Sequence, residues 1–242
     1  MKILILIPVR MASTRFPNKP MALIAGKPMV QRVWEQAVLS NLGEVIVACS
    51  EIEVHNHITS LGGKAEMTDP NLPSGTDRIF EAINNYSNIS HYDSIINLQG
   101  DMPIINPEDI EKANIPLQQG FDMGTLVTEL TKDQSTDINV TKAKIEWINQ
   151  HKIGKALDFG KNILDLNGSN IYHHVGIYSF RYETLKKFIS MVPSNNEIKR
   201  KLEQLRALDA KMTIGVSYVK DVPISVDTKK DLLKVEKIIK SL

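Results

Sequence analysis

The apolar run Ile3–Val9 places the tightest limit on what this chain can fold into. The run carries no charged residue and is rich in β-branched isoleucine and valine. Such a strand must be covered on both faces, which is typical of a central strand in a parallel sheet. Two further buried strands are predicted at Glu44–Ser50 and Ser94–Leu98, with helical patterns between them. The alternation predicts an α/β fold with a doubly wound, mostly parallel sheet.

The remaining periodicities extend this pattern along the chain. Helices are predicted at Pro28–Ser40, Ile52–Leu61, Thr76–Tyr86 with Thr76 as the N-cap, from Pro107 onward, and at Tyr182–Met191, Asn195–Asp209 and Thr228–Leu242. Further strands are predicted at Lys64–Thr68, Thr125–Leu130, Lys142–Trp147, Lys155–Phe159, His174–Phe180 and Met212–Val219. The short alternating strands predict an antiparallel, β-rich insertion over about 123–180, within one domain that spans residues 1–242.

Charge and cysteine content exclude several classes of protein. The chain has 29 lysines and arginines against 28 acidic residues, so its formal charge is only +1. A general nucleic-acid or polybasic membrane surface needs an excess of cations, which this composition lacks. The single cysteine, Cys49, lies in an apolar stretch and is expected to be a buried thiol rather than a nucleophile. No apolar run reaches the ~18 residues of a membrane span, so we expect a soluble cytoplasmic protein without membrane insertion.

A cationic loop, RMASTRFPNKP, follows the first strand at residues 10–20. It holds Arg10, Arg15 and Lys19 next to small residues that let a ligand approach the backbone. It is neither a Walker A loop nor a GxGxxG loop, and a solvated basic turn is the simpler alternative. Because ligands of doubly wound sheets bind beyond the carboxyl ends of strands, its position favours a polyphosphate site.

Three shorter segments carry chemistry of their own. Residues 73–78, PSGTDR, lie where a helix is predicted to begin, which suits an anion but equally an ordinary helix cap. Asp101 follows a buried strand, where a carboxylate suits Mg²⁺ or a simple turn. Thr228 and Asp231 are predicted to form a capping box, which leaves Asp227 without a structural role. Asp101 and Asp227 would share one metal if the late strand lay beside the strand that precedes Asp101.

Six segments in this order resemble the 3-deoxy-manno-octulosonate (Kdo) cytidylyltransferase family: RMASTRFPNKP, SGTDR, LQGD, HVGIY, LEQLR and ISVDTKKDL. Each motif is weak alone, but the set covers nearly the whole chain. The resemblance implies a nucleotide-diphospho-sugar transferase-like, Rossmann-type fold in which the β-rich insertion serves as a flap and dimerisation element. It further implies a homodimer that uses Mg²⁺ to join CTP and Kdo, giving CMP-Kdo and pyrophosphate for lipopolysaccharide biosynthesis.

The resemblance also assigns residues to roles. CTP is expected to contact Arg10, Ser13, Arg15, Lys19, Ser74, Gly75 and Gln99. The sugar is expected to contact Arg78, Gln99, Lys161, His174, Tyr178, Glu203 and Gln204, and Mg²⁺ to be held by Asp101 and Asp227. The sugar's anomeric hydroxyl would attack the α-phosphorus, with Arg15 and Lys19 stabilising the pyrophosphate that leaves. Arg15, Lys19, Asp101 and Asp227 are therefore the expected catalytic set.

Three departures from the family pattern leave alternatives open. Gly160-Lys161-Asn162 replaces the usual Ser-Arg, so Lys161 stands in for an arginine without its bidentate fork. Ala48-Cys49-Ser50 replaces the usual Ala-Thr-Asp, and Met102 replaces a glutamate. The first departure keeps open a cytidylyltransferase for a related acid sugar, such as 8-amino-Kdo or a sialic-acid relative. A catalytically silent nucleotide-binding module is the more remote alternative.

Overall fold

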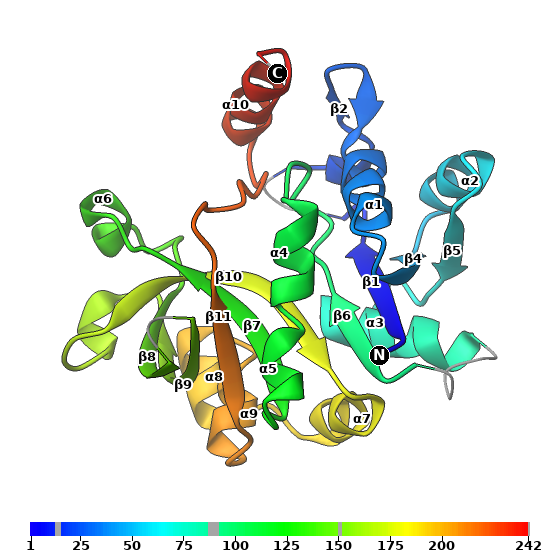
Figure 1. Cartoon of the computed structure of the whole chain (residues 1–242). Helices are drawn as coiled ribbons and strands as arrows, with labels where there is room; N and C mark the ends of the chain where they lie inside the picture. Colours follow the sequence, from blue (N-terminus) through cyan, green and yellow to red (C-terminus); the bar gives the residue numbers. More distant parts are fainter. Residues whose placement is uncertain (13–15, 87–91, 150–151, 242) are drawn as a thin grey trace. The chain divides into compact units, whose positions relative to one another are not determined.

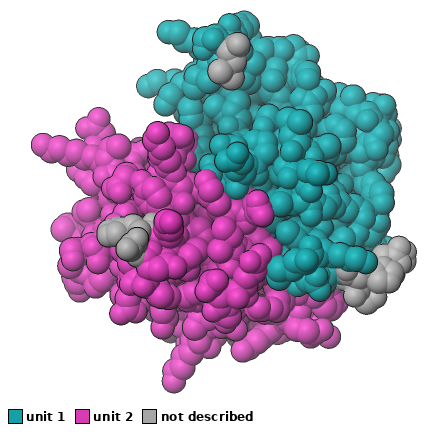
Figure 2. All heavy atoms as spheres, in the orientation of Figure 1, with its two compact units in different colours: residues 1–110, 223–242 teal, residues 111–222 magenta. Residues whose placement is uncertain are grey.

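The computed structural model describes residues 1–12, 16–86, 92–149 and 152–241. Within the single domain predicted over 1–242, these residues form two compact units, which Figure 2 colours separately. The first unit comprises residues 1–110 and 223–242, and the second comprises residues 111–222. None of the described helices is long and apolar enough to cross a bilayer.

The first unit is built on a parallel sheet with strand order β5-β4-β1-β6. These strands are β1 (Ile3–Val9), β4 (Gly43–Cys49), β5 (Lys64–Met67) and β6 (Ser94–Asn97). Figure 1 shows β1 flanked by β4 and β6, in a register where Ile3 lies opposite both Gly43 and Ser94. The side chains from Leu4 to Ile7 have no exposed surface, so β1 is covered on both faces as its composition predicts.

The order of these strands determines where a ligand can bind. From β1 the chain passes outward to β4 and then β5, and it returns on the other side of β1 as β6. The direction of winding therefore reverses between β1 and β6, which confirms the predicted doubly wound arrangement. Loops at the carboxyl ends of two such strands separate and leave a crevice for a ligand. The loop after Val9 and the segment after Asn97 border this crevice.

Helices and short elements connect these strands. They are η1 (Lys19–Met21), β2 (Leu23–Ile24), β3 (Lys27–Pro28), α1 (Met29–Leu39), α2 (Ile52–Ser60), α3 (Gly75–Asn85), α4 (Pro107–Lys112) and α10 (Lys229–Ile239). The predicted capping box at the start of α10 is confirmed, because the Asp231 amide donates to Thr228 Oγ1 and the Thr228 amide donates to Asp231 Oδ2.

The predicted N-cap of α3 is wrong by two residues. The cap is Ser74, whose Oγ accepts hydrogen bonds from the amides of Thr76 and Asp77, both at 3.1 Å. Thr76 already lies inside the helix, where its hydroxyl accepts from Asn97 Nδ2. Serine and threonine are both good caps, so the sequence pattern did not distinguish these positions. The N-terminus of α3 lies next to the carboxyl end of β1, where a Cβ atom at Gly75 would come within 3.2 Å of Pro8 Cγ.

The second unit is rich in strands. They are β7 (Met123–Thr128), β8 (Lys142–Asn149), β9 (Ile153–Gly160), β10 (Ile171–Phe180) and β11 (Ile214–Tyr218). The pairings run β10-β7-β11-β9-β8, and β8 also pairs with the start of β10, so the five strands close into a ring. All the pairs are antiparallel except β7 with β11. The β-rich region predicted over 123–180 is present, and its ring also recruits β11 from beyond that range.

The helices of this unit are α5 (Ile115–Gln118), α6 (Lys132–Thr136), η3 (Ile163–Asp165), α7 (Tyr182–Ser190), α8 (Asn195–Arg200) and α9 (Leu205–Asp209). The single helix predicted over Asn195–Asp209 is therefore wrong, because two helices occupy that range. Lys201 adopts a left-handed backbone with φ of 55° and ends α8. Glycine usually marks such a residue, so a lysine there gave no signal in the sequence.

Candidate active site

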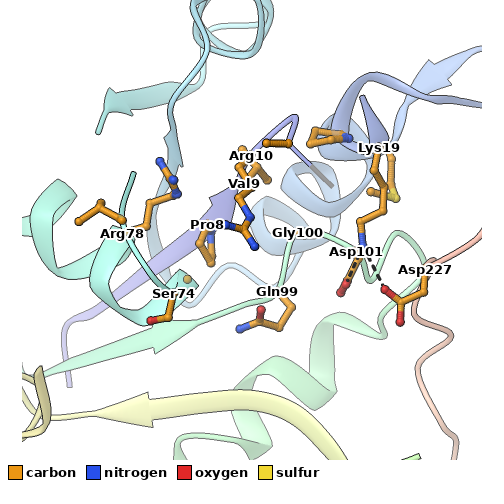
Figure 3. A pocket seen from close by; sticks show the side chains of 15 residues that line it. Pro8, Val9, Arg10, Lys19, Ser74, Arg78, Gln99, Gly100, Asp101 and Asp227 are labelled. Atoms are coloured by element: carbon orange, nitrogen blue, oxygen red, sulfur yellow. Dashed lines mark hydrogen bonds and ion pairs between the residues drawn. The ribbon is translucent and has the colours of Figure 1, made fainter. Parts of the chain in front are cut away.

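A cavity of about 350 Å³ opens in the first unit where the winding reverses. Its wall combines the loop after β1, the start of α3, the segment after β6 and the segment before α10 (Figure 3). Eight residues predicted from the sequence line it: Arg10, Lys19, Ser74, Gly75, Arg78, Gln99, Asp101 and Asp227. The fold thus gathers predicted residues that lie more than 200 positions apart in the chain. Ser13 and Arg15, which were also assigned to CTP, lie outside the described residues.

Gly100 is required by the close approach of β1 to the segment after β6. A Cβ atom at this position would lie 2.4 Å from Val9 Cγ1 and 2.9 Å from the carbonyl oxygen of Pro8. Any larger residue would push Asp101 away from the cavity. The neighbouring Gln99 donates from Nε2 to Asn97 Oδ1 at 3.1 Å, which fixes its amide at the cavity wall.

Asp101 and Asp227, the two predicted metal ligands, lie close together, but not because the late strand neighbours the strand before Asp101. The late strand β11 belongs to the second unit and pairs there with β7 and β9. The connection comes instead from Val226, whose amide donates to the carbonyl oxygen of Asp101 at 2.8 Å. Val226 is fully buried in an apolar cluster with Phe16, so the adjoining Asp227 is held beside Asp101.

Lys19 lies between these carboxylates. Its Nζ is 3.0 Å from Asp101 Oδ2 and 3.4 Å from Asp227 Oδ1, as the dashed lines in Figure 3 mark. The sequence assigned Lys19 to the triphosphate, whereas here its ammonium contacts both acidic side chains. The contact shows that the two carboxylates converge on a single cation.

Two carboxylates are also the complement that Mg²⁺ commonly takes from a protein, with water and substrate phosphates supplying the other ligands. Among the described residues, no group of three or more histidine, cysteine and acidic side chains gathers around one point. Asp101 and Asp227 therefore fit an ion whose coordination shell is completed by a nucleotide. They do not form a closed structural metal site.

Arg78 forms a buried part of the cavity wall. Its side chain is only 2% exposed, and Nη1 donates to Thr68 Oγ1. Burial is the main cause that lowers the pKa of the Arg78 guanidinium; the Glu51 carboxylate opposes this shift and the Arg10 charge adds to it. Arg10 and Arg78, together with the N-terminus of α3, make this side of the cavity suited to an anion.

Two of the residues predicted for the sugar, Arg78 and Gln99, line the cavity of the first unit, whereas the other five lie in the second unit: Lys161, His174, Tyr178, Glu203 and Gln204. The His174 ring is 5.0 Å from the ring of Phe159 and 5.5 Å from that of Tyr178, and its Nε2 is 3.0 Å from Thr125 Oγ1. Burial lowers the pKa of His174 to about 3, with a smaller contribution from His173. The imidazole is therefore neutral at physiological pH.

Tyr178 and Glu203 belong to the same cluster. Burial raises the pKa of Tyr178 well above its usual value, and the Glu203 charge adds to the shift. Gln204, next to Glu203 in the chain, is buried. Lys161 is fastened through its backbone, because its carbonyl oxygen accepts a hydrogen bond of 2.7 Å from the fully buried Lys142.

Sequence reasoning missed Glu51 and Lys142. Glu51 accepts a hydrogen bond from the amide of Met11, in the loop that borders the cavity. Lys142 was assigned only to a strand. Neither belongs to a recognisable motif, and the one usable signal for Glu51 was its position two residues after the end of β4.

Comparison with known proteins identifies the family of the chain. A model of the cytidylyltransferase family matches residues 4–214. A 3-deoxy-manno-octulosonate cytidylyltransferase of Paramagnetospirillum magneticum is 42% identical over 240 residues, with 98% of each chain covered. One of Parvibaculum lavamentivorans is 41% identical over 233 residues, covering 96% of this chain and 90% of the other.

A solved structure supports the same assignment. A CMP:2-keto-3-deoxy-manno-octonic acid synthetase complexed with CTP superposes with a TM-score of 0.89 at 31% identity, covering 100% of this chain and 99% of the other. These similarities confirm the resemblance seen in the six sequence motifs, and they confirm the Rossmann-type nucleotidyltransferase fold. The chain belongs to the 3-deoxy-manno-octulosonate cytidylyltransferase family of nucleotidyltransferases.

Proposed function

We propose that this protein transfers CMP from CTP to the anomeric hydroxyl of Kdo, giving CMP-Kdo and pyrophosphate for lipopolysaccharide biosynthesis. The observation that carries the proposal is the cavity at the β1–β6 reversal. There two arginines, a lysine and two converging carboxylates lie together in a chain of this family. Cationic side chains alone would bind many kinds of anion. The added pair of carboxylates suits a metal–nucleotide complex and a phosphoryl-type transfer.

The cations of the cavity bind the triphosphate in this proposal. Arg10 and Arg78 offer planar guanidinium groups, which match phosphate oxygens in bidentate geometry. The amides at the start of α3 are capped by Ser74 and carry the partial positive charge of the helix terminus. The predicted contribution of Ser13 and Arg15 concerns residues outside those described.

Asp101 and Asp227 would hold Mg²⁺. When bound, the ion would neutralise charge on the α-phosphate and lower the pKa of the attacking hydroxyl. With Asp101 and Asp227 holding such an ion, the Lys19 ammonium would be available to the phosphates of the nucleotide. Lys19 thus reaches the role that the sequence assigned to it through an exchange of partners.

The reaction itself is an in-line displacement. The anomeric oxygen of the sugar forms a bond to the α-phosphorus while the bond from that phosphorus to the bridging oxygen breaks. The electron pair leaves with pyrophosphate, and the Lys19 ammonium stabilises the charge that develops there. The proton of the anomeric hydroxyl passes to solvent water as the new bond forms, and the proposal assigns no side chain as a general base.

We assign five residues of the second unit to the acid sugar: His174, Tyr178, Glu203, Gln204 and Lys161. His174 and Tyr178 are both neutral, so they would recognise sugar hydroxyls by hydrogen bonds rather than by charge. Lys161 would supply the positive charge for the carboxylate. Because a lysine lacks the fork of the usual arginine, a related acid sugar is the second candidate substrate.

A panel of acid sugars tests the proposal. Kdo, 8-amino-Kdo and a sialic acid would each be incubated with CTP and Mg²⁺, and pyrophosphate release would be measured with mass spectrometry of the product. Fastest turnover with Kdo supports the proposal. Faster turnover with another sugar would contradict Kdo as the substrate and identify that sugar instead. CTP binding without pyrophosphate release from any sugar would favour a silent nucleotide-binding module. The same preparation would test the expected homodimer by light scattering, and fractionation of the source cells would test the expected cytoplasmic location.

A further inference from the structure

Glu51 occupies the cap position of α2 but does not cap that helix. Its backbone is extended, with φ of −119° and ψ of 133°, and its side chain makes no hydrogen bond to the first-turn amides. A residue at this position ordinarily satisfies those amides with a short side chain. The Glu51 carboxylate is turned elsewhere, so the stability of α2 does not account for it.

The carboxylate instead bonds to the loop after β1 at its neck, where Met11 and Asn18 meet. Glu51 Oε1 accepts a hydrogen bond of 3.1 Å from the amide of Met11. The carbonyl oxygen of Met11 in turn accepts one of 3.1 Å from the amide of Asn18. The second bond joins the start of the loop to its end, and the first bond joins this neck to Glu51. Asn18 directly precedes Lys19.

The second oxygen of the same carboxylate has a different environment. Glu51 Oε2 is buried, and no hydrogen bond to it is found within the part of the chain that the structure describes. A buried carboxylate oxygen is costly unless positive charge offsets it. The Arg78 guanidinium interacts favourably with Glu51, whereas Arg78 and Arg10 repel each other.

Arg78 is itself tied to the end of β4. Its Nη1 donates to Thr68 Oγ1, and that hydroxyl donates to the carbonyl oxygen of Cys49 at 3.0 Å. The adjoining Ser50 donates from Oγ to Glu51 Oε1 at 2.8 Å. Ser50 stands where the family pattern has an aspartate, so in this chain the carboxylate after β4 comes from the next residue.

We propose that Glu51 is a positioning residue for nucleotide binding, which fixes Met11 at the loop neck and balances the charge of Arg78. Glu51 does not line the cavity, so it acts through these two residues and not by touching the substrate. The inference rests on the proposed function, because it assigns a supporting residue to the nucleotide half of that site. Loss of the carboxylate removes the hydrogen bond that holds Met11. It also removes the negative charge that offsets the Arg78 guanidinium.

The test compares Glu51→Ala and Glu51→Gln with Glu53→Ala. Glu53 is exposed in the first turn of the same helix, so this control removes a similar charge from the N-terminus of α2 without touching the loop. Calorimetry with CTP and Mg²⁺ measures nucleotide affinity directly, and steady-state kinetics give KM for CTP and for the sugar. Hydrogen exchange of peptides that contain Met11 and Asn18 reports on the loop neck.

Glu51→Ala is expected to weaken CTP binding roughly tenfold or more, to raise KM for CTP in parallel, and to leave KM for the sugar within about twofold. Exchange at Met11 and Asn18 should accelerate. Glu51→Gln keeps an acceptor for Met11 and should lose only about threefold in CTP affinity, which also provides a folded variant if the alanine substitution misfolds. The Glu53→Ala control should match the wild type.

Two results would overturn the inference. One is CTP affinity within twofold of wild type in both Glu51 variants. The other is an equal loss of affinity for CTP and for the sugar, which would indicate general damage. Wild-type protein that binds CTP without transferring CMP to Kdo would contradict the proposed function alone. Normal transfer with unaffected Glu51 variants would contradict this inference alone.

Discussion

The two regions assigned to the substrates differ in how they use charge. The cavity of the first unit gathers the cationic side chains of Arg10, Arg78 and Lys19, with two carboxylates in contact with Lys19. The cluster of the second unit contains titratable groups that burial keeps neutral, above all His174 and Tyr178. A polyphosphate and its metal call for fixed charges, whereas sugar hydroxyls call for oriented hydrogen bonds. In the proposed function, charged groups therefore serve the nucleotide half of the site, and neutral hydrogen-bonding groups serve the hydroxyls of the sugar.

The largest expected effect comes from removing a carboxylate of the cavity. Asp101→Asn and Asp227→Asn should each lower turnover by at least about a thousandfold, because the metal charge that the reaction needs is no longer held. Pyrophosphate release measures the loss, and circular dichroism should show a folded protein. Asp133→Asn, on the exposed first turn of α6, is the control and should keep normal turnover. Near-normal turnover in either cavity variant would contradict the assignment of Asp101 and Asp227 as metal ligands.

Lys19→Met tests separately the two proposed roles of the Lys19 ammonium, which are contact with the carboxylates and stabilisation of pyrophosphate. Without nucleotide, Mn²⁺ should bind roughly tenfold more tightly to this variant than to wild type, because no ammonium competes for the carboxylates. Turnover should still fall by about a hundredfold, since the charge that stabilises pyrophosphate is lost. Electron paramagnetic resonance counts free Mn²⁺ and needs no activity. Unchanged or weaker Mn²⁺ binding would show that Lys19 and the metal do not compete.

The neutral cluster predicts a stability effect that depends on pH. Burial lowers the pKa of His174 from 6.5 to about 3 in the folded protein, so below pH 6.5 the unfolded chain binds a proton that the folded chain does not. Stability is therefore lost as pH falls, with a slope that approaches about 1.4 kcal/mol per pH unit. Burial and Lys142 lower the pKa of His173 as well, which adds to the slope.

His174→Gln should flatten this dependence. Glutamine retains hydrogen-bonding capacity toward Thr125 but has no ionisable group, so urea unfolding between pH 5 and pH 7 should show a smaller slope than wild type. His55→Gln serves as the control because it removes a histidine from α2 in the first unit and leaves the buried cluster of the second unit intact. Equal slopes for wild type and His174→Gln would mean that the buried imidazole titrates normally.

Some features of the fold and the site could be predicted from the sequence, and others could not. Ile3–Val9 was sufficient to predict the central strand, because only a doubly covered strand tolerates seven such residues. The cavity residues were found because they follow strand ends, where side chains of an α/β sheet converge. The contact of Val226 with Asp101 was not predictable, since it depends on a single long-range backbone hydrogen bond. Glu51 was missed for a similar reason, as its partner Met11 lies 40 positions away.

The smallest expected effect concerns the cap of α3, which connects helix stability to the cationic cavity. Ser74→Ala removes the acceptor of the Thr76 and Asp77 amides and should lower the free energy of unfolding by about 1 kcal/mol. Ser74 itself lines the cavity, so CTP affinity should also fall, but only about threefold because Arg10 and Arg78 remain. Thr131→Ala removes the equivalent cap of α6 and should cost similar stability without changing CTP affinity. A loss of CTP affinity in both variants would attribute the effect to stability, whereas a loss confined to Ser74→Ala places the α3 terminus among the groups that bind the nucleotide.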